Sequence, residues 1–178
     1  MIVMTIAKRG RRKKKRNYDV KIINNSSSTT TQIPAIVVIG GTSKLRKLVL
    51  KAAVWMIYDQ VGDRVAPNIE LEITLVNGLI QDEAVYGDCF AADCMRSIRP
   101  RYFEIRIDDM LELPTLLETL AHEIVHLRQY AKDQLYEYRN GDSRYAGKRY
   151  PKDCEDVPWE EEASALEQHI YQKYSSQL

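Results

Sequence analysis

Two histidines and the glutamate between them have the types and spacing needed for metal chemistry. Residues 122–126 read His-Glu-Ile-Val-His, an H-E-x-x-H pattern, with strong helix formers on both sides. Residues four apart lie on the same face of a helix, so the imidazoles of His122 and His126 can hold one zinc ion between them. The carboxylate of Glu123 can reach a water on that ion rather than the ion itself. The pattern therefore predicts a zinc centre with a general base beside it.

The third ligand of this centre must come from elsewhere in the chain. A catalytic zinc needs three protein ligands and an open position for water. The candidates lie in one later segment with helical periodicity: Glu160, Glu161, Glu162 and His169. By helix geometry, Glu161 points about 100° away from Glu162 and Glu160 about 200° away. Glu162 and His169 share nearly one face but lie about 10 Å apart along the helix, so both cannot bind one ion.

A second motif follows the first in this chain. Residues 159–163 read Trp-Glu-Glu-Glu-Ala. The pair of motifs resembles small gluzincin-type metallopeptidases, related in style to the SprT-like and ImmA/IrrE-like minimal zincins that are frequent in phages and bacteria. In gluzincins a second helix supplies a glutamate directly followed by a small residue. The resemblance covers roughly residues 69–175 and implies Glu162 as the third ligand, with His169 as the rival because SprT-like proteins use a histidine. Arg128 departs from the pattern, which has an apolar residue there.

The resemblance implies a zinc-dependent peptidase that acts on a protein or peptide substrate. Glu123 would take a proton from the zinc-bound water and later pass it to the leaving amine. The oxyanion would need a further donor, and the loop after the motif offers Tyr145 and Tyr150, besides Arg144 and Lys148. The strand predicted over 102–108 resembles the edge strand along which zincins hold an extended peptide.

Hydrophobic periodicity predicts the elements that must position these residues. Strands are expected over 33–39, 69–76, 86–95 and 101–108, and helices from Thr42 or Ser43 to about Gln60, from Leu113-Pro114 through the motif, and from Trp159 to about Tyr174. The expected core stripe of the central helix is Leu117, Leu120, Ile124, Leu127 and Ala131. This order predicts an α+β domain over 33–178, zincin-like, with a small, mainly antiparallel sheet packed on helices and H-E-x-x-H on the central helix.

Residues 1–32 differ from the rest in composition and are expected to form a basic, Ser/Thr-rich, disordered arm, in which 20–23 could form a short strand. Residues 8–16 hold eight of the 26 basic residues and no acidic one, which leaves 18 basic against 25 acidic residues, a net charge of −7, in the rest of the chain. The arm could bind nucleic acid or an anionic protein surface. The eight are Lys8, Arg9, Arg11, Arg12, Lys13, Lys14, Lys15 and Arg16.

Composition favours a cytoplasmic protein with no membrane partner. The chain has 178 residues, no apolar run approaching the ~20 that span a bilayer, and three scattered cysteines. A phage-encoded chain would act in the host cytoplasm or the virion. Two other functions fit the same features. One is a non-catalytic structural or virion protein that keeps a zincin fold, and the other is a nucleic-acid-associated protein that acts through the basic arm.

Overall fold

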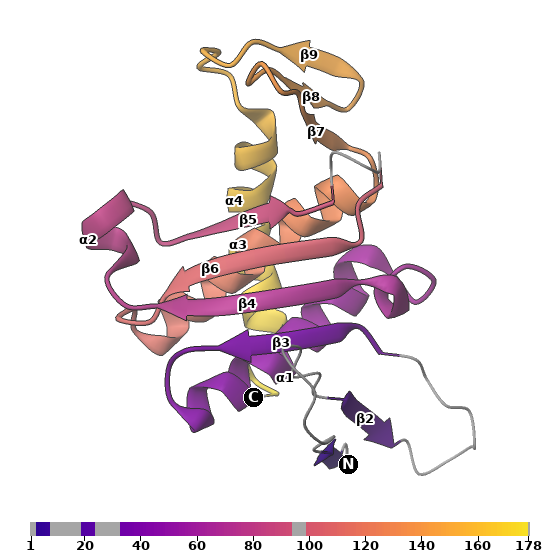
Figure 1. Cartoon of the computed structure of the whole chain (residues 1–178), viewed down its shortest axis with the longest axis vertical. Helices are drawn as coiled ribbons and strands as arrows, with labels where there is room; N and C mark the ends of the chain where they lie inside the picture. Colours follow the sequence, from indigo (N-terminus) through magenta and orange to yellow (C-terminus); the bar gives the residue numbers. More distant parts are fainter. Residues whose placement is uncertain (1–2, 8–18, 24–32, 94–98, 178) are drawn as a thin grey trace.

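A four-stranded sheet forms the middle of the protein in the computed structural model, which describes residues 3–7, 19–23, 33–93 and 99–177. The strands lie in the order β3-β4-β6-β5 (Figure 1). β3 pairs with β4 and β4 with β6 in parallel, and only β5 runs antiparallel, against β6. The strand bounds are Ala35–Ile39 for β3, Glu70–Val76 for β4, Gly87–Ala91 for β5 and Tyr102–Asp108 for β6.

The prediction of a mainly antiparallel sheet is therefore wrong for this sheet. The α+β class itself is confirmed, with helices and small sheets in one chain. The physical reason for the parallel pairs lies in the connections. A long helix, α1 (Ser43–Val61), carries the chain from the end of β3 back to the start of β4, and such a crossover makes the two strands parallel.

Helix boundaries follow the local signals in the sequence. The Thr42 side chain accepts a hydrogen bond from the backbone N–H of Leu45, 3.2 Å away, and caps the start of α1, and Gly62 follows the last residue of the helix as its C-cap. The central helix, α3 (Leu113–Ala131), has Pro114 in its first turn, where the missing N–H costs nothing. The last helix, α4 (Pro158–Ser175), also begins with a proline. Shorter turns of helix span Leu79–Glu83 (α2) and Ala66–Asn68.

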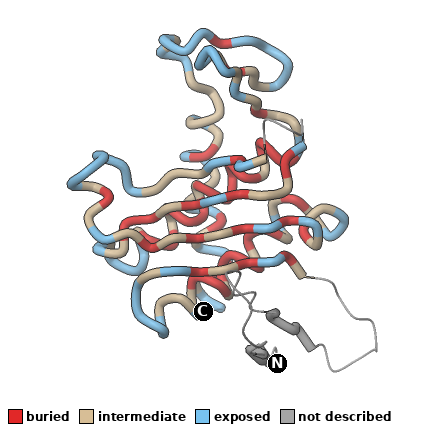
Figure 2. Tube along the Cα trace, viewed as in Figure 1, coloured by how far each residue is buried: buried red, intermediate tan, exposed pale blue. Residues whose placement is uncertain are grey.

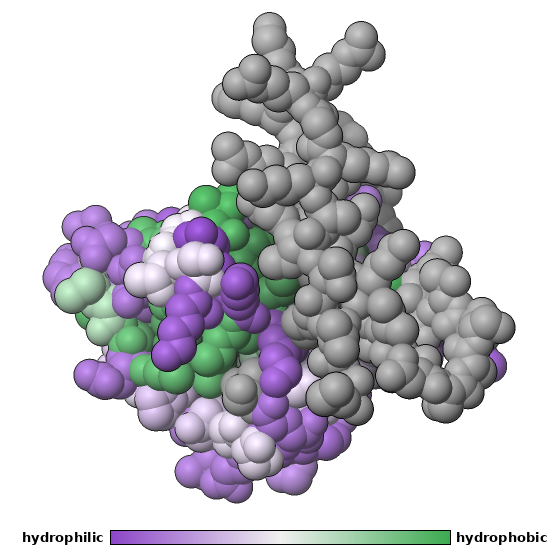
Figure 3. Space-filling view, turned by 90° about the horizontal axis from the view of Figure 1, so that it is seen from below, coloured by the Kyte–Doolittle hydropathy of each residue, from purple (hydrophilic) through white to green (hydrophobic). Residues whose placement is uncertain are grey.

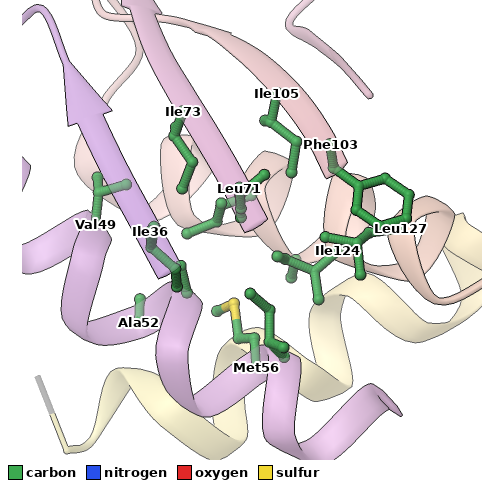
Figure 4. Packing of buried hydrophobic residues seen from close by; sticks show 14 of the residues in the cluster. Ile36, Val49, Ala52, Met56, Leu71, Ile73, Phe103, Ile105, Ile124 and Leu127 are labelled. Atoms are coloured by element: carbon green, nitrogen blue, oxygen red, sulfur yellow. The ribbon is translucent and has the colours of Figure 1, made fainter. Parts of the chain in front are cut away.

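The hydrophobic core lies between the sheet and the helices α1 and α3. Alternate residues of the strands, such as Leu71, Ile73, Phe103 and Ile105, point to this face and are 2% exposed or less. Figure 4 shows them meeting Met56 and other residues of α1 and α3. The predicted stripe of α3 is confirmed, because all five of its members are buried. Removing such area from water stabilises the fold by about 25 cal/mol per Å².

Helix α4 packs on α3, and its lower half also contacts α1 (Figure 1). The buried residues of the molecule gather along the strands and α3, as the tube in Figure 2 shows. Trp55 of α1 contacts Tyr174 of α4 with ring centroids 6.1 Å apart, and the side chain of Lys173 is paired with Asp59. The sheet and α1 thus support α3, and α3 and α1 together support α4.

Two small sheets complete the described structure. The predicted polar loop after α3 contains three short antiparallel strands, β7 (Leu135–Glu137), β8 (Ser143–Tyr145) and β9 (Lys148–Tyr150). Near the N-terminus, β1 (Val3–Ala7) and β2 (Asp19–Ile23) pair antiparallel. The predicted basic run over 8–16 lies outside the described residues.

The outer surface of the described structure is mixed in character. From below the view of Figure 1, a group of hydrophobic residues lies in the middle of the described surface, with hydrophilic residues around it (Figure 3). None of the described helices combines the length and apolar character needed to cross a membrane.

Candidate metal centre

Three potential metal ligands converge between α3 and α4. The Nε2 atoms of His122 and His126, one helical turn apart on α3, lie 3.1 Å from each other. The Oε2 atom of Glu160, in the first turn of α4, lies 3.3 Å from the Nε2 atom of His122 and 3.2 Å from that of His126. Among the described residues, these three form the group of His, Cys, Asp or Glu side chains that could hold a metal ion.

The spacing of these atoms matches a tetrahedral ion. Zinc binds histidine nitrogen and carboxylate oxygen at ~2.0–2.2 Å, so two ligands of one tetrahedral zinc lie about 3.3 Å apart. The three separations, 3.1, 3.2 and 3.3 Å, are close to that value. Two histidines and a glutamate are also a donor set that catalytic zinc uses.

Hydrogen bonds on the far sides of the rings orient both histidines. The Nδ1 atom of His122 lies 2.7 Å from Oε2 of Glu167, and the Nδ1 atom of His126 lies 2.9 Å from Oε1 of Gln129. The amide of Gln129 is itself fixed, because its nitrogen donates to the carbonyl of Trp159 and to the carboxylate of Glu162. Its oxygen must therefore face His126. Such outer partners hold metal-binding imidazoles in place.

These partners also assign the protons on the rings. A carboxylate and an amide oxygen can only accept, so each Nδ1 carries the donated hydrogen. In a neutral ring, the Nε2 atom then presents a lone pair. The lone pairs of His122 and His126 face each other and the carboxylate of Glu160. Three electron-rich atoms this close repel one another unless a cation lies among them.

Electrostatics around the rings favour positive charge. Burial by itself lowers the pKa of His122, but the hydrogen bond with Glu160 and the charge of Glu123 outweigh it and raise that pKa to about 9. Burial likewise opposes a raised pKa of His126, and the hydrogen bond with Glu160 overcomes it. Hydrogen bonds with the two histidines hold the pKa of Glu160 well below its usual range. A metal ion can take the place of the protons that this environment attracts.

Glu123 is buried beside the candidate ligands. It is 4% exposed, and no described residue forms a hydrogen bond with its carboxylate. Burial raises the pKa of Glu123 to about 7, against the lowering effect of the histidines. Burial disfavours the charged form of a carboxylate, so the position of Glu123 in the wall of a pocket points to a function. A group that titrates near neutrality is suited to take and return a proton.

Close packing of β5 on α3 positions Glu123. Gly87, the first residue of β5, lies so near to α3 that a Cβ atom there would come within 2.8 Å of Thr119 Cγ2 and 3.3 Å of Glu123 Oε1. The same Cβ would lie 2.9 Å from the carbonyl oxygen of Arg106 on β6. Only glycine leaves room for this approach.

A pocket of about 280 Å³ opens beside the three ligands. His122 and Glu123 form part of its wall, together with residues of α3, α4 and the segment before β5. The candidate metal centre is thus open on the side where Glu123 lies. The remaining lining residues are Tyr86, Thr115, Glu118, Thr119, Ser164 and Glu167.

Glu162 is predicted as the third ligand, but in the structure its carboxylate lies outside the His-His-Glu group. The carboxylate of Glu162 accepts hydrogen bonds from Gln129 and Tyr145, each at 2.8 Å, and pairs with Arg128. Glu160 takes the place next to the histidines instead. The reason is angular. Ala163, which is fully buried, lies about 60° around the helix from Glu160 but about 100° from Glu162.

Arg128, where the zincin resemblance led us to expect an apolar residue, has a charged partner in the structure. It lies on α3 with 14% of its side chain exposed and pairs with Glu162 of α4. Glu162 in turn holds Gln129, and Gln129 holds His126. Glu162 is therefore a positioning residue that acts on the centre through Gln129.

Other predicted site residues lie away from the pocket. Tyr145 donates to Glu162, and burial followed by that hydrogen bond raises its pKa to about 12. Tyr150 is buried against Trp159 with ring centroids 5.6 Å apart. Neither lines the pocket, and so the structure does not bring these two predicted oxyanion donors to it. His169, the rival ligand, is exposed on α4 and outside the His-His-Glu group.

Arg144 and Lys148 are also engaged elsewhere. Arg144 pairs with Asp133, and the Nζ atom of Lys148 lies 4.7 Å from the centre of the Tyr150 ring. The strand over 102–108 is not an edge strand either, because β6 lies between β4 and β5. The edge strand next to α3 is β5.

Sequence reasoning counted Glu160 among the candidate ligands but favoured Glu162, and it missed Glu167 and Gln129 as the outer partners of His122 and His126. A signal that favours Glu160 and points to Glu167 exists. Glu160 and Glu167 are seven residues apart, two turns of helix, so they share one face of α4 as His122 and His126 share one face of α3. Gln129 follows His126 by three residues, a spacing at which helix side chains meet.

Comparisons with known proteins add no relative. No protein-family model, curated protein or solved structure matches the chain.

Proposed function

We propose that the protein is a zinc-dependent peptidase in which His122, His126 and Glu160 hold the metal and Glu123 is the general base. The observation that carries the proposal is the convergence of two Nε2 lone pairs and a Glu160 oxygen at the spacing of zinc ligands. The resemblance of the two motifs to gluzincin-type peptidases supports the same assignment, with Glu160 in place of Glu162.

Two features favour a catalytic over a structural metal. A structural zinc is usually enclosed by four protein ligands, whereas this group supplies three and adjoins a pocket. Glu123 is also buried in the wall of that pocket with no described residue hydrogen-bonded to its carboxylate, which suits a proton acceptor rather than a structural side chain. Three ligands, an open side and a buried base are the parts that metal-assisted hydrolysis needs.

The chain's own groups then divide the work of hydrolysis. When bound, zinc lowers the pKa of water and polarises the carbonyl of the peptide bond. Glu123 accepts a proton from the attacking water and delivers it to the amide nitrogen as the C–N bond breaks. The products are a carboxylate and an amine, and Glu123 returns to its starting state. Glu167 and Gln129 hold the imidazoles so that both Nε2 atoms keep facing the same point.

The edge strand β5 offers a place for an extended substrate. Among the described strands, β5 pairs on one side with β6 and has no neighbour on the other. Its first residue, Gly87, lies against Glu123, and the preceding Tyr86 lines the pocket. A peptide added to this edge as a further strand would run past the candidate metal centre.

Metal analysis combined with a cleavage assay tests the proposal. Purified protein should contain about one zinc per chain and should cleave a denatured protein such as reduced casein. A chelator should abolish cleavage, and added zinc should restore it. Zinc-loaded protein that leaves a range of denatured proteins intact would overturn the peptidase assignment.

A further inference from the structure

We propose that the pocket beside the candidate metal centre receives a lysine or arginine side chain of the substrate, on a residue that flanks the cleaved bond. The inference rests on the proposed peptidase function and adds a substrate class to it. It is drawn from the chemistry of the pocket's walls.

Three of the eight residues that line the pocket carry carboxylates. Glu118, Glu123 and Glu167 all line it, and its described lining contains no lysine or arginine. Glu118 lies one helical turn before His122 on α3, so its side chain follows the same face as the imidazole. The hydrogen bond from His122 fixes Glu167. Glu123 is more than nine-tenths buried and lacks a described hydrogen-bond partner, so no described hydrogen bond compensates its charge. Glu118 and Glu167 are the carboxylates that would contact the cation, and Glu123 stays available to the attacking water.

The neutral side chains of the wall also suit a substrate group that has many hydrogen-bond donors. Thr115, Thr119 and Ser164 add hydroxyl oxygens. The hydroxyl of Thr119 already donates its hydrogen to the carbonyl of Thr115, 2.9 Å away, so it can only accept from a ligand. An ammonium group carries three donors and a guanidinium five, and neither has an acceptor.

Other kinds of side chain fit this wall poorly. An apolar side chain would remove water from three carboxylates and give no hydrogen bond in return. An acidic side chain would be repelled by the same groups. A cation is attracted to them, and Tyr86, which lines the pocket and is 57% exposed, adds an aromatic ring of the kind with which a cation can interact.

The pocket lies directly next to the bond that would be cleaved. His122 belongs both to the pocket wall and to the metal group, and Glu123 belongs both to the wall and to the proton-transfer machinery. Since a reacting carbonyl must lie within about 3–3.5 Å of the attacking atom, a side chain in this pocket belongs to a residue on one side of the scissile bond.

A cleavage-site survey tests the inference. The zinc-loaded full chain is incubated with a mixture of denatured proteins, and the new termini are identified by mass spectrometry. We expect Lys and Arg to be enriched at one position flanking the cleaved bond. In a peptide of the best site, replacing that residue by citrulline, which keeps the shape of arginine without its charge, should lower kcat/KM roughly ten- to hundredfold.

Variants of Glu118 locate the preference in this pocket. Glu118 is half-buried and takes no part in metal binding or proton transfer. Glu118→Lys should lower cleavage next to Lys and Arg roughly ten- to hundredfold relative to other sites, with zinc content unchanged. Glu155→Lys, the same charge change at an exposed residue outside the pocket, should leave the preference as it is.

The outcomes separate the two proposals. Cleavage that shows no basic preference, or a preference that Glu118→Lys leaves unchanged, overturns the pocket assignment while the peptidase function stands. If zinc-loaded wild type cleaves no more substrate than Glu123→Gln does, both the peptidase function and the pocket assignment are overturned.

Discussion

Glu160 and His122 are 38 positions apart in the chain, yet the Oε2 atom of the first lies 3.3 Å from the Nε2 atom of the second. The contact joins the first turn of α4 to the middle of α3, two helices that pack against each other. It completes the group of three ligand atoms, and it depends on the rotation of α4 about its own axis. If α4 were turned about its axis by the angle between successive residues, about 100°, a different glutamate would face the histidines.

Glu160 and Glu162 should therefore differ in their effect on metal binding. Glu160→Gln removes a ligand and should weaken zinc affinity by more than the roughly 10- to 100-fold that loss of an outer partner causes. Glu162→Gln should stay within that smaller range, because Glu162 acts through Gln129. Competition with a chromophoric chelator measures both affinities. A larger loss for Glu162→Gln than for Glu160→Gln would restore Glu162 as the ligand.

The sequence was sufficient for half of this centre. The spacing of His122 and His126 places both on one helical face, because that relation depends only on helix geometry. The partner on α4 depends on how two helices pack. The fact that Glu162 directly precedes the buried Ala163 is a poor guide to which glutamate faces α3. Neighbouring helix residues point about 100° apart, whereas residues three apart point only about 60° apart. The burial of Ala163 and the seven-residue spacing of Glu160 and Glu167 together contained the better signal.

Gln129 provides a second test of the centre. Gln129→Leu keeps the approximate size of the side chain but removes the acceptor of the His126 Nδ1 hydrogen. Zinc affinity should fall roughly 10- to 100-fold as the imidazole loses its fixed orientation. The same change at the exposed Gln168 of α4 is the matched control and should have no effect. Equal affinities for Gln129→Leu and wild type would show that this hydrogen bond does not position the ring.

Gly87 tests the contact between β5 and α3. In Gly87→Ala the new methyl group would meet Thr119 and the carbonyl of Arg106 at less than 3.0 Å. The free energy of unfolding should fall by about 1–3 kcal/mol, as for other overpacked sites. Adding Thr119→Ser removes the methyl group of Thr119 and should restore part of the loss, beyond what Thr119→Ser does alone. Denaturant unfolding of the four proteins measures this. A Gly87→Ala protein as stable as wild type would contradict the described approach.

The pairing of Asp59 on α1 with Lys173 on α4 makes a pH-dependent contribution to stability. Burial by itself raises the pKa of Asp59, but the hydrogen bond and charge of Lys173 outweigh it and lower that pKa below its usual value. A lowered carboxyl pKa stabilises the folded state above the unfolded pKa, and the effect is lost as the pH falls through the folded pKa.

Asp59→Asn should thus lower the melting temperature slightly at pH 7, by about 1–3 °C for a partly exposed pair. The difference from wild type should shrink as the pH falls below about 4, where the wild-type carboxyl also becomes neutral. Asp63→Asn, at an exposed position of the following turn, is the control. A difference that stays constant from pH 7 to pH 3 would show that the ion pair is not its cause.

The fold was predictable in its elements more than in their connections. Alternation in the strand predicted over 101–108 places Phe103, Ile105 and Ile107 on one face, and the structure buries all three. Alternation does not reveal strand direction, however, because side chains alternate in parallel and antiparallel sheets alike. The parallel pairing of β3 with β4 follows from the crossover through α1. The small sheet β7-β8-β9 lies in a polar, tyrosine-rich segment whose strands are three residues each, too short for a clear periodic pattern.

The most direct test of the central claim compares wild type with Glu123→Gln, both loaded with zinc. Glutamine keeps the shape of the side chain but cannot accept and return a proton. Because Glu123 is not one of the proposed ligands, zinc content should stay at about one per chain. Cleavage of a denatured protein should fall by a factor of roughly 10² to 10⁴. Equal cleavage by the two proteins, or cleavage by wild type that persists after zinc is removed, would contradict the proposed peptidase centre.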